Sequence, residues 1–220
     1  MGKNEAHTRY RLADGSIVPG VTTITGSQLG WNKNALINWA NRIGLEGISA
    51  NKYKDDKAEI GTLAHAMVTD WLQGLKTDTS DYSKNQIESA ENSAISFFEW
   101  AKEKPIKPIV IEKPFVSEKY KFGGKPDIYA QINEHLELID LKTGSGIYEE
   151  MIIQVAAYEN LLVENGFKID AVRILNIPRT EDERFMEQIV GKEQRKVAWE
   201  IFLNCLNNYN LRRLVNGRNI

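Results

Sequence analysis

The chain has 220 residues, of which 42% are hydrophobic, so it can bury a sizeable core and suits a single domain. Its 28 basic and 30 acidic residues leave a net charge of −2, which excludes long-range attraction of polyanions by bulk charge. A single cysteine, Cys205, excludes an intramolecular disulfide and any site built from four cysteines, such as an iron–sulfur cluster. No apolar run approaches the roughly 18 residues of a membrane span, and the start of the chain has no signal-peptide pattern. We therefore expect a soluble, cytoplasmic protein.

The first part of the chain is expected to form a hairpin and then helices. Residues 8–25 place β-rich runs on both sides of Asp14-Gly15, a strong two-residue turn signal, and so predict a short β-hairpin. Apolar residues at helical spacing then predict helices at residues 33–50, 56–74 and 85–103.

The second part of the chain changes to short apolar runs and a period of two. Strands are predicted at residues 108–117, 125–132, 136–142 and 171–177, and helices at 149–165 and 190–213. Apolar residues on both faces of 136–142 indicate an interior strand that is covered on each side. This order predicts an α/β fold, with a central mixed β-sheet flanked by helices behind an N-terminal hairpin and helical region.

Two carboxylates and a lysine occur in the pair of strands between residues 123 and 144. If these strands form an antiparallel hairpin, one register places Asp127 almost opposite Asp140, and Lys142 shares the face of Asp140. Opposed carboxylates repel each other, so a cation is expected between them. Lys142 is one candidate, and Mg²⁺ or Mn²⁺ held by carboxylate oxygens is another. The alternative is a surface hairpin whose charges are solvated.

Pro126-Asp127, followed thirteen residues later by Asp140-Leu141-Lys142, resembles the signature of the PD-(D/E)XK nuclease superfamily. The order of strand, turn, strand and helix around these residues is also similar to that family. The resemblance implies a restriction-endonuclease-like core in which Asp127, Asp140 and Lys142 are catalytic.

Two further motifs resemble the RecB-like branch of this superfamily. Gln154 and Tyr158 share a helix face after the lysine, and Gly61 precedes His65 by four residues on an upstream helix. Read without the resemblance, Tyr158 is a residue at the edge of the core, Gln154 is solvated and His65 is structural. Residues 18–25 also resemble an opening strand of phage and mitochondrial exonucleases, a type without an iron–sulfur cluster.

The resemblance implies a metal centre. Asp127, Asp140, the backbone carbonyl of Leu141 and His65 would hold one or two ions of Mg²⁺ or Mn²⁺. Lys142 would position or deprotonate the attacking water, and hydrolysis would leave a 5′-phosphate.

Other residues are candidates for the site or for DNA contacts. Glu112 adds a carboxylate to the site or is a charge on an edge strand. Gln154, Tyr158 and Arg179 would orient the lysine or contact DNA. Some arginines could neutralise DNA phosphates: Arg173, Arg179, Arg212, Arg213 and Arg218. Some tryptophans could stack on unpaired bases: Trp31, Trp39 and Trp71.

These inferences predict a single nuclease domain over residues 1–220. It divides into an N-terminal hairpin and helices (8–105), a catalytic core (106–185) and a C-terminal helix (186–220). The expected function is metal-dependent exonuclease action on DNA with free ends, in recombination, repair or phage DNA processing. An endonuclease on the same scaffold and a non-catalytic DNA-binding or assembly module are the alternatives. A homo-oligomer or a recombination partner protein is open, and no membrane is expected.

Overall fold

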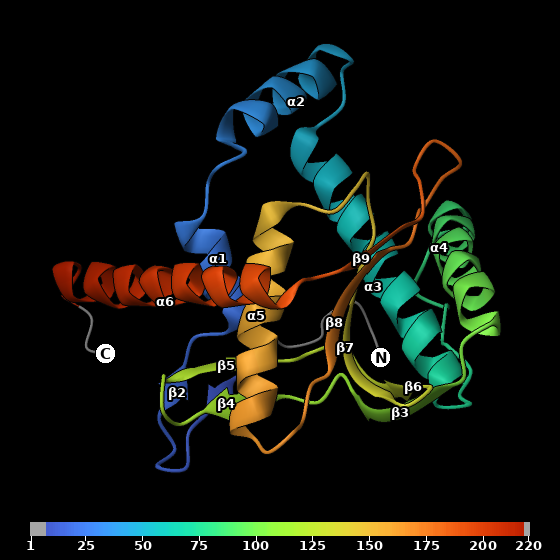
Figure 1. The fold of residues 1–220 in the computed structure, drawn as a ribbon. Coiled ribbons are helices and arrows are strands. Elements are labelled where there is room, and N and C mark those ends of the chain that lie inside the picture. The colour runs from blue at the N-terminus through green and yellow to red at the C-terminus, as the bar shows by residue number, and fades with distance from the viewer. Residues whose placement is uncertain (1–7, 218–220) are drawn as a thin grey trace.

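The structure, a computed structural model, describes residues 8–217, so His7 and Arg218 lie outside the described residues. Its centre is a five-stranded mixed sheet with the order β3-β6-β7-β8-β9 (Figure 1). Only β7 and β8 are parallel, and the other neighbours are antiparallel. The strands are β3 Ile106–Ile111, β6 Ile128–Ile132, β7 His135–Lys142, β8 Ala171–Asn176 and β9 Met186–Ile189.

Helices cover both faces of this sheet, as predicted for an α/β fold (Figure 1). One face packs against α5 and α6, which cross each other, together with α1; the other face packs against α3 and α4. The helices are α1 Val21–Gln28, α2 Lys33–Leu45, α3 Ala50–Leu72, α4 Lys84–Lys102, α5 Glu149–Glu164 and α6 Lys192–Val215. None of the helices within residues 8–217 is both long enough and apolar enough to span a bilayer.

Strand β7 is the interior strand that its composition predicts. Leu138 faces the core with α5 and α6, whereas Ile139 and Leu141 face the core with α3 and α4, and all three are fully buried. Because successive side chains of a strand alternate between its faces, a strand covered on both sides needs apolar residues in consecutive positions.

The N-terminal hairpin is shorter than predicted. β1 (Tyr10–Arg11) pairs with β2 (Ile17–Val18) across the Asp14-Gly15 turn, but the strand expected over residues 18–25 is wrong beyond Val18. The chain forms α1 there instead, because Val21, Ile24 and Thr25 at helical spacing bury one helix face. β-Branched residues had suggested a strand, and tertiary packing overrides that preference.

The strand predicted over residues 108–117 is interrupted at Glu112. That residue has φ +44°, in the left-handed region that breaks a strand. The chain leaves the central sheet here and enters a second sheet, in which β4 (Phe115–Ser117) pairs with β5 (Phe122–Gly124). Neither β5 nor β9 is among the predicted strands.

Side-chain caps set the starts of two helices. The hydroxyl of Ser49 accepts a hydrogen bond from the Lys52 N–H, so α3 begins at Ala50, and the predicted helix over 33–50 is divided there from α2. Ser83 and Gln86 form a reciprocal capping box at the start of α4. α2 stands apart from the sheet beyond the N-terminal end of α3 (Figure 1).

Candidate active site

The β6–β7 hairpin has the predicted register. Ile128 pairs with Ile139, and continuing this pairing by one residue places Asp127 opposite Asp140. The turn between the strands is tight because Asn133 adopts φ +54°, a conformation that asparagine tolerates well. The hairpin therefore brings both carboxylates to one end of the central sheet.

Asp127 lies immediately before β6, and its carboxylate completes the hydrogen bonding of β7. The Leu141 N–H donates to Asp127 Oδ2 over 2.8 Å. Burial raises the pKa of Asp127 to about 6, although the charge of Lys142 and the Leu141 hydrogen bond oppose the rise. A buried carboxylate with a raised pKa is poorly neutralised by its surroundings.

The Leu141 carbonyl faces the same side. Leu136 and Lys142 use their carbonyls toward the β8 side, accepting from the N–H groups of Asp170 and Ile177. The alternate residues of β7, including Leu141, therefore direct both backbone groups toward β6 and Asp127.

Asp140 is fully buried and under-satisfied. Lys142 Nζ forms an ion pair with its Oδ2 over 2.5 Å, and no other group among residues 8–217 donates a hydrogen bond to either carboxylate oxygen. Burial raises the pKa of Asp140 to about 6; Lys142 opposes this rise and the charge of Asp127 adds to it. Such a carboxylate leaves coordination capacity for a cation.

His65 reaches the site from α3. Its Nδ1 lies 3.8 Å from Asp127 Oδ2, and burial, with the charge of Lys142 second, lowers its pKa to about 4. The imidazole is therefore neutral at pH 7 and keeps a lone pair for a metal. Gly61, one turn earlier, permits this approach, because a Cβ there would lie 2.7 Å from Thr143 Oγ1.

Glu112 joins the same cluster from the break between β3 and β4. Ligand atoms of His65, Glu112 and Asp127 all lie within 4.8 Å of one another. The Glu112 N–H also donates to the Asp127 carbonyl over 2.9 Å. Ligands of one ion at about 2.1 Å lie at most about 4.2 Å apart, so a small inward movement would let all three bind one metal.

These groups fit a divalent cation. The under-satisfied carboxylate of Asp140, two further carboxylates and one neutral imidazole form a mainly oxygen donor set with one borderline nitrogen. Mg²⁺ prefers the oxygens, and Mn²⁺ accepts both kinds of ligand.

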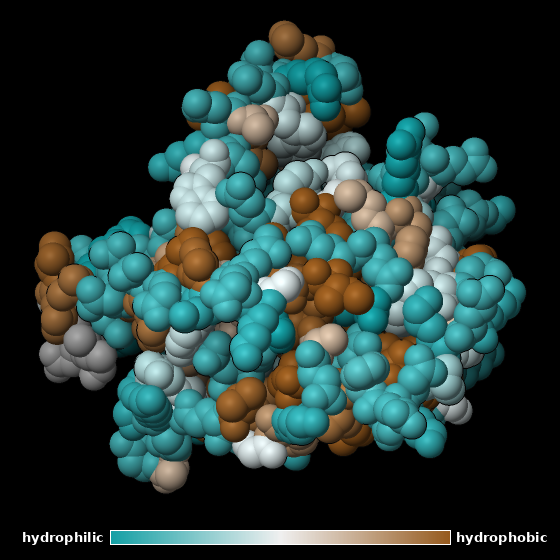
Figure 2. Space-filling view, in the orientation of Figure 1, coloured by the Kyte–Doolittle hydropathy of each residue, from teal (hydrophilic) through white to brown (hydrophobic). Residues whose placement is uncertain are grey.

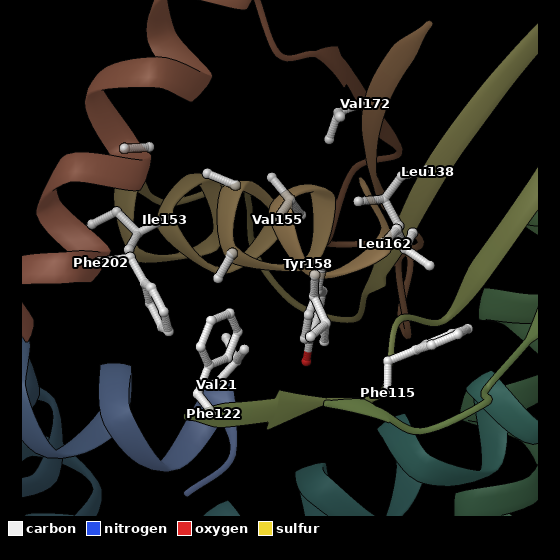
Figure 3. Close-up of a cluster of buried hydrophobic side chains, with 14 of the residues drawn as sticks. Val21, Phe115, Phe122, Leu138, Ile153, Val155, Tyr158, Leu162, Val172 and Phe202 are labelled. Carbon is white, nitrogen blue, oxygen red and sulfur yellow. The ribbon is translucent and has the colours of Figure 1, made fainter. Parts of the chain in front are cut away.

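Gln154 and Tyr158 lie together on α5, as their spacing predicts. Gln154 Nε2 donates to Tyr158 Oη over 3.0 Å, and Tyr158 is buried. Burial, followed by the charges of Asp140 and Asp127, raises the pKa of Tyr158 well above its ordinary value. Figure 3 shows its ring projecting from α5 toward the strand that carries Phe122. The pair thus borders the carboxylates while Tyr158 is also part of the core.

Gly124 makes room for Tyr158 beside the hairpin. A Cβ at Gly124 would lie 2.7 Å from the Tyr158 ring. The glycine close to the first aspartate therefore has a packing function.

The predicted arginines lie in different environments. Arg179 is ion-paired with Glu183 and is nearly buried. It lies near the loop after β7, because a Cβ at Gly144 would lie 3.8 Å from Arg179 Nη2. Arg173 is buried within β8 between Glu137 and Glu187, so it does not flank the strand and is a structural residue.

The two arginines near the C-terminus are distant in sequence from the hairpin and line another hollow. Arg212 donates to the Ser27 carbonyl over 3.1 Å, and Arg213 lies beside it along a cavity of about 450 Å³ between α1 and α6. They are not among the groups that surround the carboxylates.

The predicted tryptophans lie on the helical region. Trp31 is exposed before α2, Trp39 packs edge-on against Tyr53, and Trp71 is half-exposed against Phe98. Figure 2 shows hydrophobic residues at the outer tip of the region that carries α2, where exposed apolar side chains include Leu36, Ile37, Leu45 and Ile48.

Lys125 is a site residue that the sequence motifs did not identify. Its Nζ lies 3.0 Å from Glu112 Oε2, and its charge affects the pKa values of His65 and Asp127. In the sequence, only its position two residues before Asp127 indicates that Lys125 lies near the site.

A mixed sheet whose central hairpin gathers two carboxylates and a lysine defines a nuclease-type core. The family model described as the PD-(D/E)XK nuclease superfamily matches residues 42–220. The chain belongs to this superfamily, which confirms the resemblance found in the sequence.

Two solved structures are similar to the chain, and the first of them agrees with the fold. The crystal structure of a candidate exonuclease from Eubacterium rectale is similar with a TM-score of 0.50 and 14% identity, over 73% of this chain and 69% of that one. LHK-Exo, solved in complex with dAMP, is similar with a TM-score of 0.35 and 10% identity, over 70% of this chain and 85% of that one. The first likeness shows the fold alone. No curated protein matches the chain.

Proposed function

We propose that the protein is a divalent-metal-dependent DNA exonuclease of the RecB-like branch. The observation that carries this proposal is the convergence of Asp127, Asp140 and Lys142 with His65 and Glu112 at one end of the central sheet. DNA with free ends is the proposed substrate, and the proposed setting is recombination, repair or phage DNA processing in the cytoplasm. The free thiol of Cys205 is compatible with a reducing compartment.

The metal-binding part of the proposal uses the under-neutralised carboxylates. Asp127, Asp140, His65, Glu112 and the Leu141 carbonyl would hold one or two ions of Mg²⁺ or Mn²⁺. When bound, such ions polarise a phosphodiester and lower the pKa of water.

The protein side chains then position the reacting groups. Lys142 Nζ, next to Asp140, orients the attacking water as an ammonium group, or accepts the proton of that water after it has released a proton of its own to solvent. Gln154 and Tyr158 restrict the space on the α5 side of the carboxylates. Attack in line with the 3′-oxygen leaves a 5′-phosphate.

Timed digestion of end-labelled DNA tests the function. Single-stranded and double-stranded oligonucleotides are incubated with Mg²⁺ or Mn²⁺ beside a covalently closed circle, and products are sized and tested for a 5′-phosphate. We expect progressive shortening of the linear DNA and an intact circle. Nicking of the circle would indicate an endonuclease, whereas binding of DNA without any cleavage would indicate a non-catalytic module.

A further inference from the structure

Lys125 and Glu112 form an ion pair at the open side of the candidate active site. Lys125 Nζ lies 3.0 Å from Glu112 Oε2, and both side chains are about a third exposed, at 28% and 31%. The pair is therefore accessible to an incoming ligand, in contrast to the fully buried Asp140.

The backbone on both sides fixes this pair. Glu112 is held in its left-handed conformation while its N–H donates to the Asp127 carbonyl. Strain of this kind, about 1–3 kcal/mol, persists only where the surrounding structure enforces it. Lys125 precedes Pro126, which favours extended backbone.

Glycines next to Lys125 fix its backbone further. A Cβ at Gly123 would lie 2.2 Å from Tyr10 Cγ, so the hairpin residue Tyr10 packs directly on this segment. Tyr158 packs in the same way on Gly124. The backbone positions from which Lys125 and Glu112 reach each other are therefore restrained by the surrounding structure.

Glu112 belongs to two competing sets of contacts. It pairs with Lys125, and it also lies within 4.8 Å of the ligand atoms of His65 and Asp127. A carboxylate that coordinates a divalent ion shares its negative charge with that ion, so its attraction to an ammonium group weakens.

The net charge of the site changes sign when one divalent ion binds. With all acids ionised and His65 neutral, three carboxylates and two lysines (Lys125 and Lys142) give three negative and two positive charges, or a net charge of −1. One divalent ion would change the net charge to +1, which complements the single negative charge of a DNA phosphodiester.

We propose that Lys125 binds a phosphate of the DNA substrate after Glu112 has turned from Lys125 toward the metal. Lys125 thereby couples the two binding events, so that the metal raises the affinity for DNA and DNA raises the affinity for the metal by the same factor. This inference rests on the proposed function and assigns to Lys125 a role distinct from that of Lys142.

The test compares Lys125→Met with its parent in two binding measurements. Calorimetry with Mn²⁺ in the absence of DNA measures metal affinity. Fluorescence anisotropy of a labelled oligonucleotide, in a Lys142→Ala background that does not cleave, measures DNA affinity with and without Mn²⁺. In the protein that carries Lys142→Ala alone, we expect Mn²⁺ to tighten DNA binding about 5–150-fold, the usual range of such coupling.

Lys125→Met is expected to remove most of this coupling while Mn²⁺ alone binds as tightly as before or more tightly, because Glu112 is released from its ion pair. Lys125→Arg retains the charge and is expected to retain the coupling. Lys113→Met is the matched control. Lys113 is the residue after Glu112, so its substitution removes the same charge nearby, but its ammonium group lies over the Phe115 ring. Its coupling should equal that of the parent.

Two results would overturn the inference while leaving the proposed function intact: coupling in Lys125→Met equal to that of the parent, or weaker Mn²⁺ binding by Lys125→Met without DNA. The second result would mean that Lys125 only orients Glu112 as a ligand. Absence of Mn²⁺ binding by the parent would overturn the proposed function and this inference together.

Discussion

Two clusters of buried charge lie in the central sheet, but their charges are satisfied differently. In the first cluster, Arg173 lies between Glu137 and Glu187, and its guanidinium donates to both carboxylates. Trp100 stacks near the same guanidinium and donates to Glu187.

In the second cluster, Asp127 and Asp140 have raised pKa values, and apart from the ion pair with Lys142 the Asp140 oxygens have no polar partner among the described residues. A buried cluster whose donors and acceptors match contributes to the fold, whereas one with unmatched oxygens has capacity for a ligand. The comparison separates structural charges from functional ones within a single sheet.

The largest effect is expected from Lys142→Ala. Removal of the ammonium group that is ion-paired with Asp140 should lower the rate of DNA cleavage by about 10²–10⁴-fold, the range of a general acid or base. Far-UV circular dichroism should remain that of the parent, and Lys121→Ala, at an exposed ion pair with Glu118, should retain full activity. Robust metal-dependent cleavage by Lys142→Ala would contradict the assignment.

In the cluster around Arg173, the substitution Arg173→Met should affect stability instead. Loss of the guanidinium leaves Glu137 buried without its partner, which costs about 3–5 kcal/mol in the free energy of unfolding. For a chain of this size the melting temperature should fall by roughly 6–20 °C, measured by calorimetry. The double variant Arg173→Met with Glu137→Leu should recover most of the loss, because a buried ion pair can be replaced by apolar residues. A double variant as unstable as Arg173→Met would show that the pair itself is not the cause.

Metal affinity should depend on pH around the pKa values of the two aspartates. Asp127 and Asp140 have pKa values of about 6, so at pH 5 a metal must displace protons from both. We expect the Mn²⁺ affinity measured by calorimetry to fall about 10–100-fold from pH 7.5 to pH 5, since one unit below its pKa each carboxylate is about ten-elevenths protonated. An affinity independent of pH over this range would exclude these carboxylates as ligands.

The same two aspartates should affect the stability of the metal-free protein in the opposite direction, so that their contribution decreases as the pH rises. Their pKa values are raised from 3.8 to about 6, so between these values the folded chain binds more protons than the unfolded chain. Their contribution to the free energy of unfolding therefore falls as pH rises through this window. His65, with its pKa lowered from 6.5 to about 4, contributes in the other direction, because the folded chain binds fewer protons there.

The smallest effect is expected from Asp140→Asn. The substitution removes a buried, under-neutralised charge, so the metal-free protein at pH 7.5 should be more stable by about 1–2 kcal/mol. The increase in melting temperature produced by Mn²⁺ in the parent should be lost. A lower melting temperature for metal-free Asp140→Asn would indicate that its carboxylate is well satisfied after all.

The central hairpin could be predicted from sequence because two local signals agree. Alternation fixes which side chains share a face, and a two-residue turn leaves few registers, so the opposition of Asp127 and Asp140 follows. The spacing of Gln154 and Tyr158 gives their shared helix face for the same reason.

What the sequence did not predict depends on contacts between distant segments. The helix at Val21–Gln28 is stabilised by packing that overrides the strand preference of its residues. The break at Glu112 comes from a backbone conformation that no local pattern indicates, and β9 is a short, largely polar edge strand. Lys125 could not be paired with Glu112 until that break was known.

The site draws on segments that are far apart along the chain, and this determines when it can exist during folding. His65 and Asp127 are 62 positions apart in the sequence (127 minus 65), and they meet only when α3 has docked on the sheet. Such distant pairings close late, because the entropy of the intervening loop must first be overcome. The complete site, with His65 beside the hairpin carboxylates, therefore exists only in the finished fold, and we expect a metal ion to bind that state most tightly. Metal added to a refolding chain should leave the folding rate unchanged and slow only unfolding.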